Sequence, residues 1–514
     1  MKQLALALYG VSADDLDEVS VVTYSDFGAV GDGRTNDIDA IIATHEYANT
    51  HNLSVVAGEG KAFYIGACEK GAVIKTNTDF TGATFIIDDR VVPQNQRNVP
   101  IFTVSPGKAS YSISTLKQLS VGQTNIGIIL PEDSFIMITE AGTKRYIRKG
   151  YNSDNDGVDQ NEVVVVDKNG NISADSPIIW DYTNITSAVV TPIDQETLTI
   201  KGGTFTTIVN DYVETYVCYK RGFHVKRSNV TIEGVKHYLT NEGADGAPYD
   251  GFMVMNDCYN VTLKDCVFTP HRTFWRTVNG VRKSVGTYDI LPTRVVKLTM
   301  INCKQEVDIL DQAYWGIIGT NFCKNITLEG CKLSRIDAHQ GVHNATIIDS
   351  KLGWLGIDIT GSGELYVEGS DLYGTSLVKL RDDYGSTWHG NVTLKNCTWT
   401  PNRGRSLTDS YYYIVGGTNL QQHYFGYDCY MPTNVTLERL HVNDTKATSS
   451  YTGIMLFADL NPNRTVEIAE NTLPYKYYVT ETANISGLIL EKGKWCGIST
   501  NEFMFRNVKL NVSQ

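Results

Sequence analysis

The sequence contains no run of about 20 apolar residues, the length that a transmembrane helix requires. We therefore expect no membrane insertion. The first segment, residues 1–20, holds one lysine and a short apolar run that acidic residues follow directly. The apolar core of a secretion signal spans about 7–15 residues after a basic start. We interpret this segment as a short amphipathic element, with the remnant of a secretion signal as the alternative.

The ten cysteines lack both the dense spacing of a disulfide scaffold and the CxxC pairs of a zinc site. Four of them occupy the same place in a recurring pattern described below: Cys266, Cys303, Cys331 and Cys397. Free cysteine behaves as a small buried apolar residue. We therefore expect buried, reduced thiols.

The sequence also contains fewer basic than acidic residues, with 45 Lys and Arg against 57 Asp and Glu, and its formal net charge is -12. This balance argues against a general nucleic-acid binder or a binder of anionic membranes. Long helical patterns are scarce, whereas Tyr (29) and Gly (45) are abundant. Aromatic residues favour strands and glycine favours turns, so the composition predicts β-structure with many turns.

One pattern recurs: an asparagine, an alternating strand of Val or Ile, Thr and Leu, and a small turn. Its copies are NVTIEGVKHY (229–238), NVTLKDCVFT (260–269), NITLEGCKLS (325–334), NATIIDSKLG (344–353), NVTLKNCTWT (391–400) and NVTLERLHVN (434–443). Asn344 follows Asn325 by 19 residues, and Glu364 follows 20 residues later. Self-similarity at about 20 residues with short strands is typical of a solenoid, whose coils bury their apolar faces by stacking.

The repeat favours an all-β fold, a right-handed parallel β-helix, with a β-sandwich of coincidental self-similarity as the alternative. Asparagines should stack at the bends, where Asn tolerates the left-handed conformation. Residues 21–90 should form the cap and first coils, because they contain a helical face that covers the open end of the solenoid. Residues 91–196 break the repeat and predict an inserted small β subdomain, and 197–514 form the main β-helix.

The stretch SRIDAHQGVHN (334–344) alternates apolar and polar residues, which predicts a strand with one buried face. Aligning the coils on their asparagines places His339 beside Asp358, Arg335 beside Trp354, and Asp358 near Lys379. The outer face is then expected to carry a row consisting of Tyr314, Trp315, Arg335, Asp337, His339, Trp354, Asp358, Lys379 and Arg381.

Three functions fit this row. In a phosphodiesterase, Asp337, His339 and Asp358 would be catalytic and the cations would neutralise phosphate. The two carboxylates would alternatively hold a divalent cation, Ca²⁺ or Mg²⁺, although nothing in the sequence requires a cofactor. In a glycosidase, Asp337 and Asp358 would be the acid and base pair. In a receptor-binding spike without activity, the aromatic residues would stack on sugars. An ordinary solvated face is the plainest interpretation.

DFGAVGDGRTNDIDAI resembles the N-terminal signature of the pectate-lyase-like β-helix superfamily, which includes polygalacturonase-type hydrolases and many phage tail spikes. The Gly-His-Gly and Arg-Ile-Lys motifs of the polygalacturonases are not present. YWGIIGTNFCKNITLEGCKLSRIDAHQGVHNATI and LRDDYGSTWHGNVTLKNC resemble the β-helix of pre-neck appendage spikes from short-tailed phages of Gram-positive bacteria.

The second resemblance implies a homotrimer in the virion tail that contacts other tail proteins and degrades a cell-surface glycopolymer, the phosphodiester-linked teichoic acid. We therefore expect a depolymerase of an anionic polymer, with no nucleic acid as partner. A polysaccharide hydrolase or lyase of the pectinase type, secreted by a bacterium, is the alternative.

Overall fold

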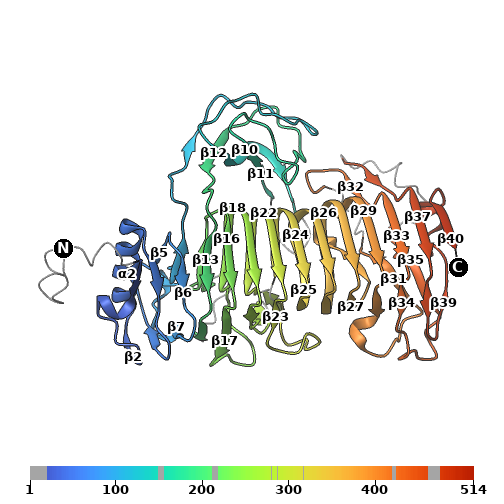
Figure 1. The fold of residues 1–514 in the computed structure, drawn as a ribbon. Coiled ribbons are helices and arrows are strands. Elements are labelled where there is room, and N and C mark those ends of the chain that lie inside the picture. The colour runs from blue at the N-terminus through green and yellow to red at the C-terminus, as the bar shows by residue number, and fades with distance from the viewer. Residues whose placement is uncertain are drawn as a thin grey trace, which may run out of the picture.

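The computed structural model describes residues 20–148, 156–210, 218–278, 280–285, 287–316, 318–418, 424–460 and 475–513. All but the last residue of the expected N-terminal segment, 1–20, lies outside these ranges. Figure 1 shows a long rod of stacked coils, with helix α2 (Ile38–His51) near the N-terminal end and a separate small sheet standing on one side. No helix among the described residues is long and apolar enough to cross a membrane.

The rod is a parallel β-helix, as predicted. Within the described residues, 32 strands join in one sheet, and successive coils pair in parallel. The N-terminal coils contain β1 (Val21–Thr23), β2 (Asp32–Asn36), β3 (Ser54–Val56), β4 (Ala62–Ile65), β5 (Ala72–Ile74), β6 (Thr78–Asp79), β7 (Thr84–Asp88) and β8 (Phe102–Val104). The middle coils contain β13 (Leu198–Lys201), β14 (Thr204–Ile208), β15 (Phe223–Val225), β16 (Val230–Glu233), β17 (Lys236–Thr240), β18 (Met253–Lys264), β19 (Val267–Phe268), β22 (Ile290–Ile301), β23 (Lys304–Gln305) and β24 (Gly319–Glu329).

The later coils carry most of the residues discussed below. Their strands are β25 (Lys332–Ile348), β26 (Lys351–Glu368), β27 (Asp371–Tyr373), β28 (Val378–Leu380), β29 (Trp388–Lys395), β30 (Thr398–Thr400), β31 (Tyr411–Gly416), β33 (Asn434–Glu438), β34 (His441–Val442), β35 (Gly453–Phe457), β37 (Thr482–Ser486), β38 (Ile489–Leu490), β39 (Lys494–Trp495) and β40 (Lys509–Ser513). A short helix, α3 (Glu502–Phe505), precedes the last strand.

The asparagine repeat has the predicted role. Asn325 and Asn344 both adopt a left-handed backbone, with φ of 55° and 64°. The Asn344 Nδ2 donates to the Asn325 Oδ1 at 2.9 Å, so the side chains link one coil to the next. Asn434 repeats the bond to Asn391 at 2.9 Å. The bends are therefore stacked by side-chain amides, because Asn accepts this backbone more readily than other residues with a Cβ.

The interior of the rod is apolar and holds the predicted thiols. All ten cysteines are free, and the four in the repeat are buried. At the N-terminal end, α2 buries the expected apolar side, which consists of Ile38, Ile41, Ile42, His45 and Ala48. The helix covers the first coil, whose backbone groups would otherwise lack partners.

The inserted subdomain is a four-stranded antiparallel sheet. Its strands are β9 (Tyr111–Ser112), β10 (Ser134–Arg145), β11 (Val158–Val166) and β12 (Ser187–Pro192). It has its own apolar core, and a second cluster packs Phe135, Val163 and Val165 against Val296 of the rod. The expected boundary at residue 91 precedes β8, which pairs within the β-helix.

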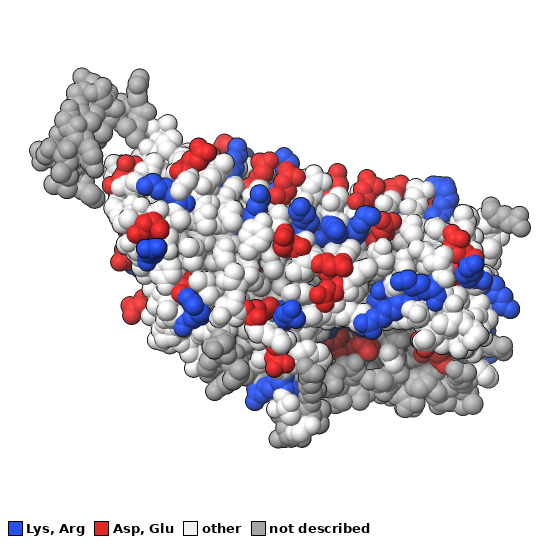
Figure 2. Space-filling view, turned by 90° about the horizontal axis from the view of Figure 1, so that it is seen from below, with Lys and Arg blue, Asp and Glu red and all other residues white. Residues whose placement is uncertain are grey.

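The remaining short elements do not belong to the 32-stranded sheet or to the sheet of the subdomain. They are the hairpin β20 (Phe274–Val278) and β21 (Val281–Val285), the pair β32 (Cys429–Tyr430) and β36 (Tyr477–Tyr478), and the 3-10 turns η2 (Tyr24–Phe27), η3 (Asp89–Val91), η4 (Gln94–Gln96), η5 (Asp382–Tyr384) and η6 (Asn402–Gly404). Figure 2 shows the side of the rod opposite the subdomain, where basic and acidic side chains lie next to one another.

Candidate functional site

The predicted carboxylates lie in register on successive coils. Asp337 of β25 pairs with Asp358 of β26, which pairs with Lys379 of β28. The neighbouring Ile336 belongs to the core, so Asp337 lies on the opposite, outward face of its strand. The predicted proximity of Asp358 and Lys379 is confirmed. The pairing of His339 with Asp358 is wrong, because Asp337 takes that place.

Salt bridges join the predicted charges into one network. The Arg335 Nη2 lies 2.8 Å from the Asp337 Oδ2 and 3.0 Å from the Asp358 Oδ2. The Arg381 Nη1 lies 2.5 Å from the Asp337 Oδ1, and the Lys379 Nζ lies 3.6 Å from the Asp358 Oδ2. Arg335 thus occupies the position between the two carboxylates where the sequence suggested a divalent cation. In the described part of the chain, no three His, Cys, Asp or Glu residues are grouped to hold a metal ion.

The network continues to the subdomain. Arg381 donates from Nε and Nη2 to the carboxylate of Asp383 at 3.0 and 2.8 Å. The Arg148 Nη2, just beyond β10, lies 2.9 Å from the same carboxylate. The Tyr288 hydroxyl donates to Asp337 from the other side. This chain of charges therefore fastens the subdomain to the coils.

The outer face is covered, contrary to the expectation of an open row. Arg335 and Asp337 are 1% and 0% exposed. Burial raises the pKa of the Asp337 carboxyl, but Arg335 and Arg381 outweigh burial and hold this pKa well below its usual range. Burial and Arg381 lower the pKa of His339 to about 4. His339 contacts the Asn321 Oδ1 at 3.3 Å and is neutral near pH 7.

The aromatic residues of the predicted row are also engaged. Trp354 is buried, and its Nε1 donates to the Tyr314 carbonyl at 3.1 Å. The Arg403 guanidinium lies 5.0 Å from the centre of the Trp354 ring, and the Arg335 guanidinium 5.1 Å from that of Trp315. Stacked guanidinium groups occupy these rings, so the expected free aromatic patch is not formed there.

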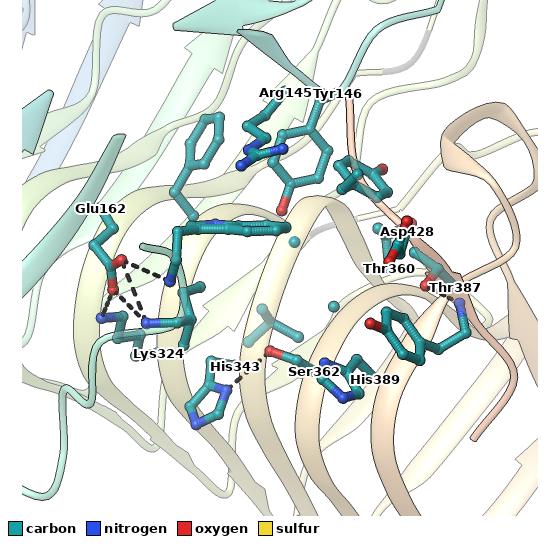
Figure 3. A pocket seen from close by; sticks show the side chains of 18 of the residues that line it. Arg145, Tyr146, Glu162, Lys324, His343, Thr360, Ser362, Thr387, His389 and Asp428 are labelled. Atoms are coloured by element: carbon teal, nitrogen blue, oxygen red, sulfur yellow. Dashed lines mark hydrogen bonds and ion pairs between the residues drawn. The ribbon is translucent and has the colours of Figure 1, made fainter. Parts of the chain in front are cut away.

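A cleft of about 400 Å³ opens beside this network, between the subdomain and the corner where β25, β26 and β29 bend. The structure assembles it from segments far apart in the sequence (Figure 3). Its lining includes Arg145, Tyr146, Glu162, Trp180, Asp181, Lys324, His343, Ser362, His389, Tyr427, Asp428, Tyr430 and Tyr475. None of these residues was in the predicted site.

The floor of the cleft is a ladder of polar and aromatic side chains on successive coils. His343, Ser362 and His389 are in register, and the His343 Nδ1 lies 2.9 Å from the Ser362 Oγ. The His389 ring stacks on Tyr430, with centroids 3.9 Å apart and planes at 13°. Tyr430 stacks on Tyr478 at 4.7 Å and 10°, which extends the ladder beyond the cleft. Tyr478 is 41% exposed, so the ladder ends at the surface.

The histidines of this floor act as neutral hydrogen-bonding groups. Burial, together with the charge of nearby Lys324, lowers the pKa of His343 to about 4. Burial also lowers the pKa of His389. Both rings are therefore uncharged at neutral pH and can donate or accept hydrogen bonds.

A buried ion pair fixes the wall that the subdomain contributes. The Lys324 Nζ lies 2.5 Å from the Glu162 Oε2 and donates to the Val163 and Pro177 carbonyls at 2.8 and 2.6 Å. Glu162 also accepts from the Trp180 backbone at 3.2 Å, which positions that side chain in the cleft. The Lys324 and Glu162 side chains are 1% and 2% exposed, so this ion pair is buried where the subdomain meets the coils.

Two other carboxylates of the cleft have no cationic partner among the described residues. The Asp181 Oδ1 accepts from the Val121 backbone at 2.9 Å, and the Asp428 Oδ1 accepts from the Lys476 backbone at 2.9 Å. Asp181 belongs to the subdomain and Asp428 to the loop before β32, so they come from different walls. Each Oδ2 has no donor in the described ranges and is available to a ligand.

The sequence contains one signal for this cleft. Ser362 follows His343 by the repeat interval of 19 residues, and the structure pairs the two. The contribution of Trp180 and Arg145 had no such signal, because the repeat does not place the subdomain.

Comparisons with known proteins agree with the fold. No protein-family model matches the chain. A capsule KL64-specific depolymerase of Klebsiella phage P510 is 28% identical over 96 residues, which cover 16% of this chain. The match spans only 9% of the length of that depolymerase.

Solved structures match over nearly the whole chain. The tailspike of Acinetobacter baumannii bacteriophage AP22, in complex with capsular saccharide, matches with a TM-score of 0.48 and 10% identity over 95% of this chain and 75% of the tailspike. The tailspike of Pseudomonas phage phi297 matches with a TM-score of 0.55 and 10% identity, over 96% of this chain and 84% of the tailspike. The chain thus has the parallel β-helix fold found in phage tailspikes.

Proposed function

We propose that this protein is a phage tailspike that binds a polysaccharide of the bacterial surface in the cleft and cleaves it. The observation that carries the proposal is the cleft itself, where stacked rings, neutral histidines and two free carboxylates converge. Concave sites with a few convergent polar groups are the usual form of ligand sites. The tailspike fold and the short match to a capsule depolymerase support the same function.

Binding would use the ladder. Aromatic faces provide rigid apolar platforms with a polar edge, which suits the alternating C–H and hydroxyl surfaces of a sugar ring. His389 and Tyr430 are stacked nearly parallel, and Ser362 lies beside His389 in register. A polymer lying along this direction would follow the axis of the rod.

Cleavage would use the two free carboxylates. In glycoside hydrolysis one carboxyl protonates the leaving oxygen and the other acts as base or nucleophile. Asp181 and Asp428 fill these roles in our proposal. The Asp337 carboxylate accepts hydrogen bonds from Arg335, Arg381 and Tyr288. The charged cluster around Asp337, which the sequence predicted to be catalytic, therefore holds the subdomain against the coils.

The proposal is tested with purified capsular polysaccharides and a reducing-end assay. We expect the wild type to release reducing ends from one of them, and Asp428→Asn and Asp181→Asn each to lower the rate by about 10²–10⁴-fold, the usual contribution of an acid or base. Binding without any product from a wide polysaccharide panel would instead identify a receptor-binding spike. Full activity in both variants would refute the assignment of these residues.

A teichoic-acid-like polymer cut at phosphodiester bonds is the second candidate. Arg145 favours it, because this cation in the cleft has no acidic partner among the described residues. New phosphomonoester ends, rather than reducing ends, from poly(glycerol phosphate) would select it, and a chelator would test for Ca²⁺ or Mg²⁺. The homotrimer, the virion tail location and the contacts with other tail proteins belong to the same proposal, and light scattering of the purified protein measures the trimer.

A further inference from the structure

Arg145 stands out among the arginines around the cleft because no carboxylate of the described residues lies within ion-pair distance of it. Arg148, Arg335 and Arg381, which belong to the charge network beside the cleft, all have acidic partners. Burial lowers the pKa of Arg145, which means that its charge is partly removed from water. A desolvated cation without a counter-ion is unfavourable unless a ligand supplies the negative charge.

The guanidinium of Arg145 is held in one orientation. It lies 4.5 Å from the centre of the Trp180 ring, so its plane is supported by an aromatic face. Its Nε donates to the Gln160 Oε1 at 2.8 Å, and its Nη1 donates to the Gly426 carbonyl. Gln160 is fully buried and is itself fixed by a hydrogen bond to the Asp181 carbonyl at 2.9 Å. Both walls of the cleft therefore position this group.

These contacts leave part of the guanidinium free. The Nη2 has no acceptor in the described part of the chain, and Arg145 lines the cleft (Figure 3). Of the acidic residues that line the cleft, Glu162 pairs with Lys324, and neither Asp181 nor Asp428 forms an ion pair with Arg145. An oriented arginine with an unused edge is suited to hydrogen-bond an oxyanion, which it does more strongly than a neutral acceptor.

We propose that Arg145 binds the anionic group of the polymer's repeating unit and makes the cleft selective for acidic polysaccharides. The inference rests on the proposed function and adds the chemistry of the substrate. The shared chemistry is an oxyanion that accepts from Nη2, either the carboxylate of an acidic sugar or a phosphate ester. Because Trp180 and Gln160 fix the guanidinium before binding, little side-chain entropy is lost when the anion binds.

The test measures binding of the full chain to a polysaccharide that it cleaves, in native and carboxyl-reduced forms. The variants are Arg145→Met and Arg145→Lys, with Arg405→Met, an exposed arginine outside the cleft, as matched control. We expect Arg145→Met to weaken Kd for the native polymer by about 10- to 100-fold, as for loss of a charged hydrogen bond. Arg145→Lys should lose less, and Arg405→Met should bind normally.

Carboxyl reduction separates the sources of charge. If the anion is a uronate, the wild type binds the reduced polymer as weakly as Arg145→Met does, and glucuronate competes in the wild type alone. If it is a phosphate ester, reduction has no effect and inorganic phosphate competes instead. If Arg145→Met lost as much affinity for a neutral polymer, or lost no affinity for an acidic one, the inference would be overturned while the proposed function stayed intact. Absence of all polysaccharide binding would overturn both.

Discussion

Replacing Asp337 by asparagine should destabilise the fold before it affects any chemistry. The carboxylate is 0% exposed and accepts from Arg335, Arg381 and Tyr288. Asparagine keeps the shape but removes the charge, and its amide N–H groups can face the guanidinium groups. The guanidinium groups of Arg335 and Arg381 would then each lose one negatively charged partner. Removing one partner of a buried ion pair costs about 3–5 kcal/mol, because the remaining charge stays desolvated.

The assay is urea unfolding followed by tryptophan fluorescence, with the midpoint converted to a free energy of unfolding. The matched control is Asp371→Asn, which removes an acidic partner of Lys351 at 2.7 Å on the surface, where the two side chains are 40% and 57% exposed. An exposed pair contributes about 0–1 kcal/mol. The reasoning predicts a clear difference between the two variants. A loss below about 1 kcal/mol in Asp337→Asn, with polymer cleavage abolished, would refute the structural role and restore Asp337 as a catalytic residue.

Three further predictions concern the subdomain, pH and the ladder. Lys324→Met should lower the free energy of local opening of the subdomain by about 3–5 kcal/mol, because it leaves the Glu162 carboxylate buried without a cation. Hydrogen exchange of the backbone amides in residues 134–192 measures this free energy, and the double variant with Glu162→Gln should recover part of the loss. The free energy of unfolding should fall as the pH drops from about 6.5 towards 4. His339 and His343 have folded-state pKa values of about 4, below the unfolded value, so the unfolded chain takes up protons first. An unfolding midpoint that stays constant across that pH range would contradict the burial of these two histidines. Tyr430→Ala should weaken polymer binding by about tenfold with an unchanged unfolding midpoint, measured by calorimetry, since it removes a platform for about one sugar ring.

The repeat predicted the fold because each coil obeys the same local rule. Asn325 and Asn344 mark the bends, and the strands between them alternate as the core requires. The same rule brought Asp358 to Lys379 on the next coil. These features depend only on neighbouring coils, so sequence spacing is sufficient to find them.

The spacing of the repeat did not predict the strand register at the candidate site. His343 pairs with Ser362 at the 19-residue interval, but Asp337 pairs with Asp358 at 21 residues, because β26 contains extra residues before that point. The bulge includes Trp354, whose backbone N–H donates to the Ile309 carbonyl at 3.0 Å. A loop from another coil therefore sets the shift, and bulges of this kind re-aim side chains.

The sequence did not predict the cleft, for a related reason. Its walls come from the subdomain, the coil corner and the loop before β32, and nothing periodic relates Arg145 to Tyr430. Burial was equally hidden, because the residues that cover Asp337 belong to other segments. Alternation tells which face a side chain takes, whereas covering that face depends on the tertiary fold.

The most direct test of the account is a crystal structure of the protein with a fragment of its polysaccharide bound. We predict sugar rings in the cleft, stacked on His389 and Tyr430, with an anionic substituent at the Arg145 guanidinium. Sugar bound instead over Trp315 and Lys379, with the cleft empty, would contradict the central claim.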